Sequence, residues 1–413
     1  MADLLAGRRV LVVSTNYAPE HSGTGPYSTQ IAEHLAALCA EVHVLTGMPH
    51  YPAWRVDDAY RGRWRVQESL RGVQVHRRRH FVPSRQTALL RASYEMSFLA
   101  HGAVGPPRAR PDIVLTQTPS LAGATLGARF ARRHRVPHVV VVQDLMGAAA
   151  AQSGIRGGER VAFLVAGAEA RVLRSAALVG VIHESFVDRV SAMGVPTSRI
   201  RVVPNWTHVS CPTGDRAAVR ERLGWRRDEV VVLHSGCMGL KQGLEVLVDA
   251  ARIAVGDIPR IRVVLMGEGS QRSRLERLAE GLPNLDVVPP AEDKEFPDVL
   301  AAADLLAVTQ RASVLDMSLP SKLTSYFAAG RPVVASVAAQ GGTAQEVRRS
   351  GAGVVVEPGD PRVLLNAVRQ LSLDQERFAA LGSRGPGYVK ERLGREAGLG
   401  RITALLSEAL TTY

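Results

Sequence analysis

The chain has 413 residues, of which 46% are hydrophobic and 22% charged, and its formal net charge is +12 at pH 7. This length is too great for one hydrophobic core and suits two or three domains, and the composition excludes a disordered or fibrous protein. The apolar stretches fall short of the ~18–20 residues that a bilayer span requires, and residues 1–13 lack the order of a signal peptide. Three cysteines without metal-ligand spacing (Cys39, Cys211 and Cys237) favour a reducing compartment. We therefore expect a cytoplasmic globular protein.

The positive charge is concentrated in the first half of the chain. Residues 1–210 hold 25 basic and 14 acidic side chains, a net charge of +11, whereas residues 211–413 hold 26 and 25, a net charge of +1. This asymmetry indicates an anionic partner (nucleic acid, a lipid headgroup surface or a phosphorylated substrate), or only a compositional preference for arginine. Lysine occurs at four positions, all in the second half: Lys241, Lys294, Lys322 and Lys390.

Each half begins with an apolar run, a glycine-bearing loop and a helical pattern. In the first half we expect a strand over 9–13, a helix over 27–38, and further strands over 42–45, 113–116, 139–142 and 178–182. In the second half we expect strands over 229–233, 263–266, 285–288, 305–308, 333–335 and 353–356, with helices over 243–253, 271–279 and 363–371. Buried β-branched runs that alternate with amphipathic helices are typical of parallel βα units.

A turn-rich stretch from Pro204 to Gly214 follows the predicted strand 200–203 and indicates a domain boundary. The pattern predicts two Rossmann-like, doubly wound α/β domains that face each other across a cleft, over residues 1–205 and 206–386. A terminal helix over 388–410, within the segment 387–413, is expected to cross back to the first domain.

Ligands of open parallel sheets bind beyond the carboxyl ends of the strands. Strand 229–233 is followed by Gly236, Met238, Gly239 and Lys241. Glycines let the backbone approach an anion, amide groups of the next helix point at it, and a lysine adds a point charge. A tight βα turn with a solvated lysine is the alternative.

Two further loops of the second half are candidates. The sequence Gly267-Glu268-Gly269 after the next strand is equally consistent with a simple turn. Ser321 and Lys322 lie at the start of a predicted helix, where hydroxyl, amide and ammonium groups could all donate hydrogen bonds to a diphosphate. With two of four lysines in such positions, the second domain is predicted to bind phosphate.

The first half offers fewer chemical signals. Gly23, Thr24 and Gly25 follow the first strand, and Asp144 follows the strand 139–142. At that position Asp144 could accept a hydrogen bond from a substrate hydroxyl or cap the N-terminus of a helix. Residues 1–210 contain eleven of the twelve histidines, without metal-ligand spacing. The run His76-Arg77-Arg78-Arg79-His80 is predicted to be a solvated loop.

These elements resemble the GT-B glycosyltransferases of the retaining family four, which includes sucrose synthase and many bacterial polysaccharide enzymes. The most similar patterns are those of colanic-acid-type exopolysaccharide and fucosamine transferases. The resemblance covers essentially the whole chain, in family order, through the segments 23–25, 47–54, 91–98, 143–145, 203–206, 236–243 and 320–323.

The resemblance implies a role for each candidate residue. Lys241, with the backbone of Gly236–Gly239, would hold the donor's diphosphate together with Ser321, Lys322 and Leu323, and Gly267–Gly269 would lie beside the nucleoside. Gly23–Gly25 would close over the phosphates from the other domain, and Asp144 would face the transferring sugar or its acceptor. Relatives often carry two glutamates eight residues apart, but here the second position is Ser325 and the nearest acid upstream is Asp316. Cys237 stands where that branch commonly has asparagine.

The predicted reaction moves a sugar from a nucleotide-diphosphate sugar to a hydroxyl acceptor, with retention of configuration and without a metal or a cofactor. Lys241, Lys322 and loop amides would stabilise the leaving diphosphate. The basic first half suggests a polyprenyl-diphosphate-linked acceptor at the anionic inner face of the cell membrane, with peripheral association. Residues 89–104, near Trp54 and Trp64, are either an interfacial surface or a core helix.

Three alternatives share parts of this pattern. A transferase that decorates a soluble natural product would share every donor motif. A GT-B-like nucleotide-sugar epimerase would need no acceptor. A non-catalytic nucleic-acid binder could use the basic half, but the sequence has no helix-turn-helix or RNA-binding aromatic motif, so nucleic acid is not an expected partner.

Overall fold

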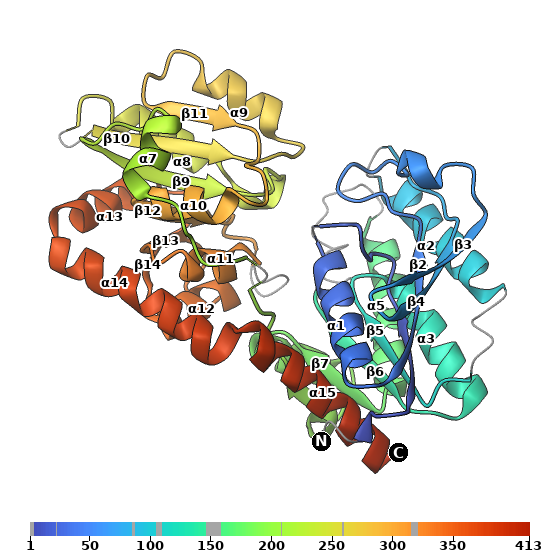
Figure 1. Ribbon diagram of the computed structural model, residues 1–413. Coiled ribbons are helices and arrows are strands. Elements are labelled where there is room, and N and C mark those ends of the chain that lie inside the picture. The colour runs from blue at the N-terminus through green and yellow to red at the C-terminus, as the bar shows by residue number, and fades with distance from the viewer. Residues whose placement is uncertain are drawn as a thin grey trace. The chain divides into compact units, whose positions relative to one another are not determined.

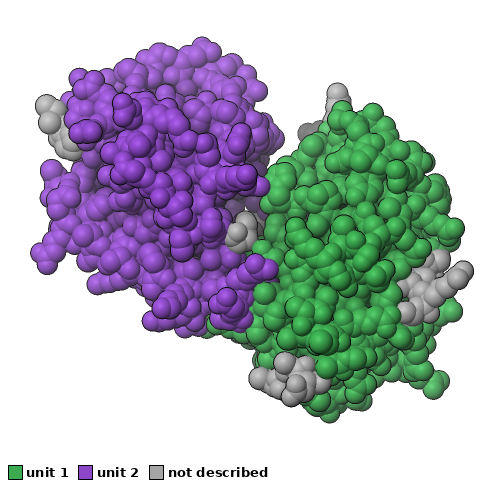
Figure 2. Space-filling model, in the orientation of Figure 1, with its two compact units in different colours: residues 1–204, 398–413 green, residues 205–397 purple. Residues whose placement is uncertain are grey.

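The structure, a computed structural model, describes residues 4–21, 23–84, 87–104, 110–145, 158–207, 209–257, 260–314 and 321–413. The chain divides into two units (Figure 2). Unit 1 consists of Met1–Pro204 and Gly398–Tyr413, and unit 2 consists of Asn205–Ala397. None of the described helices is both long enough and apolar enough to cross a membrane.

Unit 1 is built on an eight-stranded sheet with helices on both faces (Figure 1). The strand order is β3-β4-β2-β1-β5-β6-β7-β8, and all pairs are parallel except β3 with β4. The strands are β1 (Arg9–Val13), β2 (Glu41–Gly47), β3 (Arg65–Leu70), β4 (Val73–Arg78), β5 (Ile113–Gln117), β6 (His138–Val142), β7 (Leu178–Val181) and β8 (Ile200–Val202). The longer helices are α1 (Gly25–Ala37), α2 (Ala88–Ala103), α3 (Leu121–His134), α5 (Gly158–Ser175), α6 (Ser185–Ala192) and α15 (Arg395–Thr412).

The prediction of a solvated loop over residues 76–80 is wrong. Strand β4 includes His76, Arg77 and Arg78, and all three side chains are buried. The guanidinium of Arg77 is fully buried. Its Nε lies 2.5 Å from the Glu68 carboxylate on β3, and its Cζ lies 5.0 Å from the Tyr60 ring centre. Ion pairing and ring contact compensate the desolvation of the charge, so a basic run can form part of a sheet.

Unit 2 contains a six-stranded, wholly parallel sheet in the order β11-β10-β9-β12-β13-β14. The strands are β9 (Glu229–Ser235), β10 (Arg260–Met266), β11 (Leu285–Val288), β12 (Leu305–Thr309), β13 (Val333–Ser336) and β14 (Gly353–Val356). The helices are α7 (Arg216–Arg222), α8 (Glu245–Ile253), α9 (Arg272–Ala279), α10 (Phe296–Ala302), α11 (Lys322–Ala328), α12 (Gly342–Ser350), α13 (Pro361–Leu373) and α14 (Gln375–Tyr388).

Alternating side chains of unit 2's strands form two hydrophobic clusters. On β9, Val231 and Leu233 belong to one cluster and Val232 belongs to the other. Strands buried on both faces need β-branched residues at successive positions, which is the pattern that the sequence shows. The prediction of two doubly wound, Rossmann-like α/β domains is confirmed.

The end of the chain differs from the single helix expected over residues 388–410. Helix α14 ends at Tyr388, a π-helical turn covers Val389–Leu393, and Gly394 has an extended backbone before α15 begins. Within unit 1, α15 lies along β7 (Figure 1), where the Leu405 side chain packs against Gly180. Arg201 Nη2 lies 2.5 Å from the carboxylate of Glu408, which fixes the helix to β8.

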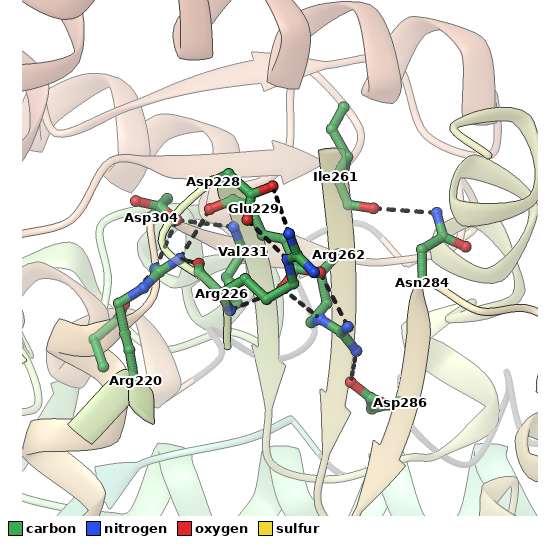
Figure 3. A network of polar contacts seen from close by, with 11 residues as sticks. Arg220, Arg226, Asp228, Glu229, Val231, Ile261, Arg262, Asn284, Asp286 and Asp304 are labelled. Carbon is green, nitrogen blue, oxygen red and sulfur yellow. Dashed lines mark hydrogen bonds and ion pairs between the residues drawn. The ribbon is translucent and has the colours of Figure 1, made fainter. Parts of the chain in front are cut away.

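A polar network stabilises the amino ends of the strands in unit 2 (Figure 3). Arg220 is 5% exposed and donates to Asp304 (2.9 Å) and to the carbonyls of Ala302, Arg226 and Glu229. Asp304 also accepts from the amide of Val231 at 2.8 Å. These bonds satisfy the backbone groups where β9 and β12 begin. Ligands of open parallel sheets bind at the opposite edge, beyond the carboxyl ends of the strands.

Candidate functional site

Two glycine loops at the carboxyl edge of unit 2 pack backbone against backbone. The amide of Gly236 donates to Met266 O (2.9 Å), and the amide of Met238 donates to Glu268 O (2.8 Å). A Cβ atom on Gly267 would lie 1.9 Å from Gly236 O, and one on Gly269 would lie 2.5 Å from Met238 O. Both glycines also have positive φ, 149° and 152°. Only glycine allows this close approach, so the Gly267-Glu268-Gly269 sequence supports the neighbouring loop and is more than a simple turn.

Lys322 lies against the first of these loops. It is the first residue of α11, and its Nζ lies 3.4 Å from the position that a Cβ of Gly236 would occupy. The same Nζ lies 3.1 Å from Nε2 of His234, a side chain that is 1% exposed. Since Nδ1 of His234 lies 3.3 Å from the carbonyl of Ala307, that nitrogen can donate while Nε2 accepts from Lys322.

The surroundings of Lys322 change its acidity. Burial lowers its pKa to about 7, and the neighbouring Cys237 thiol acts in the opposite direction. Burial, and then the charge of Lys322, lower the pKa of His234 well below its usual value, so His234 is neutral at pH 7. His234 could not be predicted as a site residue, because a lone histidine inside a buried strand carries no spacing signal.

Lys241 has a different environment in the same loop region. It lies in a short 3-10 turn, Leu240–Gln242, with its side chain exposed. Its carbonyl accepts from the amide of Arg311 (2.9 Å), and the Gln242 side chain accepts from the amide of Gly239 (3.1 Å). The turn is therefore fixed by backbone contacts while the ammonium remains available to a ligand.

The other predicted residues of unit 2 fall into two groups. Met238, Leu323 and Ser325 are buried, at 0%, 1% and 4% exposure, so their side chains contribute to packing. Ser321 and Glu268 are exposed, and Glu268 pairs with Arg272 one turn along α9. Asp316 lies outside the described residues.

The predicted residues of unit 1 lie at the carboxyl edge of its own sheet. Gly23 has φ 66° and packs against Tyr51, and a Cβ on Gly25 would lie 2.9 Å from the carbonyl of Glu20. Thr24 immediately precedes α1. After β6, the hydroxyl of Thr118 accepts from the amide of Asp144 (3.3 Å) and donates to its carbonyl (2.9 Å). This clamp holds Asp144 at the strand end, half-buried.

The loop after β2 is tied to the loop after β1 by a buried carboxylate that the sequence analysis did not select. Oε1 of Glu20 accepts from the amides of His50 (2.8 Å) and Tyr51 (2.9 Å), and Oε2 accepts from Asn16 Nδ2 (2.8 Å). Glu20 is 6% exposed, so these bonds replace its lost hydration. The only sequence signal is its position just after a strand end.

Comparison with known proteins identifies the family. Residues 22–206 match the profile described as "Glycosyl transferase 4-like domain", and residues 229–374 match the one described as "Glycosyl transferases group 1". A protein of Escherichia coli named as a colanic acid biosynthesis glycosyl transferase, WcaI, is 30% identical over 380 residues, which cover 88% of this chain and 92% of that protein. The chain belongs to the group 1 glycosyltransferases.

Solved structures show the fold that this glycosyltransferase shares. Sucrose-phosphate synthase from Thermosynechococcus elongatus superposes with a TM-score of 0.75 at 19% identity, over 98% of this chain and 100% of that one. Alr3699/HepE of Anabaena, in complex with UDP-glucose, gives a TM-score of 0.68 at 18% identity, over 97% and 100%. The expected GT-B fold is confirmed.

Proposed function

We propose that this glycosyltransferase moves a sugar from a nucleotide-diphosphate sugar to a hydroxyl of a lipid-linked saccharide in cell-surface polysaccharide synthesis. The observation that carries the proposal is the contact of Lys322 with the Gly236 loop, at the sheet edge where parallel α/β folds bind ligands. The similarity to a colanic acid biosynthesis protein and to a structure holding UDP-glucose supports it.

In the proposed reaction, charge develops on the diphosphate as the bond to the sugar breaks. Lys322 and Lys241 would stabilise this charge, and a preorganised donor of this kind is worth about 3 kcal/mol. The amides of Gly236, Met238 and Gly239, which the resemblance assigned to the diphosphate, donate instead to Met266 O, Glu268 O and the Gln242 side chain. We expect retention of configuration by attack from the leaving-group face, with no metal and no protein nucleophile. Asp144 would face the transferring sugar or its acceptor.

The donor is tested by thermal unfolding with a set of nucleotide-diphosphate sugars. One of them should raise the melting temperature, because a ligand that binds only the folded state stabilises it. Lys241→Ala and Lys322→Ala should each lose most of this shift. Lys390→Ala is the matched control, since Lys390 is an exposed lysine of the same unit that lies in the π-helical turn Val389–Leu393 and not in a loop that follows a strand. A shift that all three variants retain would contradict the proposed donor site.

The lipid-linked acceptor requires unit 1 to reach a membrane surface. Several large apolar side chains of this unit are exposed: Trp64 (58%), Leu89 (76%), Met96 (62%), Phe163 (79%) and Leu164 (71%). Tyr94 and Phe98 on the inner face of α2 are buried, so this helix belongs to the core and also presents apolar groups outward. Arginines near such groups add about 1 kcal/mol each toward anionic lipid.

Liposome flotation tests the membrane surface. We expect the chain to float with vesicles that contain anionic lipid, and the double variant Arg61→Glu/Arg63→Glu to float less. The control Arg274→Glu/Arg277→Glu makes the same charge change on exposed positions of unit 2 and should float like the unmodified chain. Equal flotation of all three proteins would argue against a membrane-bound acceptor.

A further inference from the structure

Arg91, in the first turn of α2, lies over two aromatic rings. Its Cζ lies 4.9 Å from the ring centre of Trp54 and 5.0 Å from that of Tyr94. Among the residues that the structure describes, no carboxylate forms an ion pair with its guanidinium, but its charge acts on Glu95: burial raises the pKa of that carboxyl, and Arg91 opposes the rise. A guanidinium placed over aromatic rings keeps its N–H groups directed outward in its own plane, where they can donate to another group.

The nearby carboxylates are used elsewhere. Glu20 is saturated by its three donors in the loops after β1 and β2. Glu95, one turn further along α2, accepts through Oε2 from the amide of Ala122 (2.9 Å) and the hydroxyl of Ser120 (3.2 Å), and its buried Oε1 has no hydrogen-bond partner among the described residues. Within the described part of the chain, the half-buried guanidinium of Arg91 therefore has no ion-pair partner and can donate to a ligand.

The two rings beneath Arg91 are held in place. Tyr94 is 2% exposed, and its hydroxyl lies 3.2 Å from Nε2 of His50, whose backbone amide is bound by Glu20. The Trp54 ring packs edge-on against Tyr94 at 5.7 Å and against His50 at 5.7 Å. Because these rings cannot easily move, Arg91 is presented in a defined position rather than as a mobile surface arginine.

This group, which we call the Arg91 shelf (Arg91, Trp54, Tyr94 and His50), lies beside the predicted substrate loop of the same unit. Trp54 contacts Tyr51 at 6.0 Å between ring centres, and Tyr51 packs against Gly23. The half-buried Trp54 also exposes part of its ring to solvent. This apolar surface could contact a sugar ring or a lipid chain next to a charged group.

We propose that the Arg91 shelf binds a phosphate group of the acceptor substrate. The inference rests on the proposed function, since it places an acceptor on unit 1. Guanidinium and phosphate form paired, charge-assisted hydrogen bonds, and the aromatic rings would contact the part of the acceptor next to the phosphate. The phosphate could belong to a lipid diphosphate or to a soluble phosphorylated acceptor, and the two sources differ in what the rings contact.

Calorimetric titration of the full chain with geranyl diphosphate, inorganic pyrophosphate and geraniol tests the proposal. Arg91→Gln should weaken diphosphate binding about tenfold or more, Arg91→Lys should weaken it less, and geraniol should bind poorly to every variant. Tighter binding of geranyl diphosphate than of pyrophosphate would assign the site to lipid diphosphate, and equal binding would assign it to phosphate alone. The titrations are carried out with the donor site saturated by the sugar nucleotide that stabilises the protein most, because a diphosphate could otherwise also bind at Lys241 and Lys322.

The matched control is Arg79→Gln, because Arg79 also stands over a tryptophan, 5.8 Å from the ring centre of Trp64, outside the shelf. Diphosphate binding that Arg91→Gln leaves unchanged, or that Arg79→Gln weakens equally, would overturn the inference. Donor-induced thermal stabilisation is measured on the same variants. If Arg91→Gln retains that stabilisation, the proposed function stands whichever way the acceptor result falls.

Discussion

Lys322 has an unusual partner for a buried ammonium. Instead of a carboxylate, it faces the neutral imidazole of His234 at 3.1 Å. A hydrogen bond to a neutral acceptor does not offset the desolvation of the charge, so the pKa of Lys322 falls to about 7. A diphosphate placed beside the ammonium would favour its charged form and raise that pKa again. Donor binding and protonation of Lys322 should therefore be coupled.

This coupling predicts how donor affinity depends on pH. Above pH 7 the empty site holds a largely neutral Lys322, so binding must take up a proton, and affinity should fall as the pH rises from 7 to 9. Calorimetry in two buffers of different ionisation enthalpy, with the sugar nucleotide that stabilises the protein most, measures the proton uptake. Lys322→Arg, which stays charged, should abolish the uptake. Equal affinity of the unmodified protein at pH 7 and 9 would refute the coupling.

The two edges of the unit 2 sheet are held together by different kinds of contact. The amino edge is closed by side chains that satisfy the backbone, among them Arg220, which pairs with Asp304 (Figure 3). At the carboxyl edge, Gly267 and Gly269 let the backbone of one loop contact the backbone of the next. The first edge contributes to stability, and the second brings Lys241 and Lys322 to the glycine loops, where a ligand can bind.

The stability of the amino edge can be tested with two arginines of one helix. Arg220→Ala removes the side-chain donor of three carbonyls and one of the donors of Asp304, and breaking a buried pair in this way costs about 3–5 kcal/mol of unfolding free energy. Arg222→Ala, also in α7, removes an exposed pair with Glu295 and should cost less than about 1 kcal/mol. Urea unfolding of both variants measures the difference. Similar losses for the two would show that the network adds no stability.

For the molecule as a whole, buried histidines determine the response to acid. Burial lowers the pKa of His76 to about 4, and of His80 and His138 to about 3. These folded-state values lie below the unfolded value of about 6.5, so the unfolded chain binds more protons between them. Their contribution to stability is complete above pH 6.5 and is lost as the pH falls toward 3.

Thermal unfolding between pH 7.5 and 5 measures this loss, and the melting temperature should fall as the pH decreases. His76→Gln should reduce the slope, because the amide can still meet Gln67 and His43 but takes up no proton. A melting temperature that is flat over this range, or an unchanged slope in the variant, would contradict the assignment. The excess positive charge of residues 1–210 adds repulsion in the same direction.

Much of the fold could be predicted from short-range patterns, and the failures have a common cause. The valine-rich strands and the glycine loops after them were recognisable because each is a run of adjacent residues. The hairpin of β3 and β4 was not recognisable, because a run of arginines is typical of a solvated segment. Only the contacts of Glu68 and Tyr60 with Arg77 explain its burial. The helix over residues 388–410 was predicted as continuous because nothing local but Gly394 marks its interruption.

The sequence by itself determined two parallel-sheet halves and the positions of Lys241, Lys322 and the glycines at strand ends, since periodicity and turn chemistry act over a few residues. Only the tertiary structure decided that His234 faces Lys322, 88 residues away, and that the Arg91 guanidinium lies over the Trp54 ring. Such pairs depend on which strands lie side by side, and strand order is set by the packing of the whole sheet rather than by any local pattern.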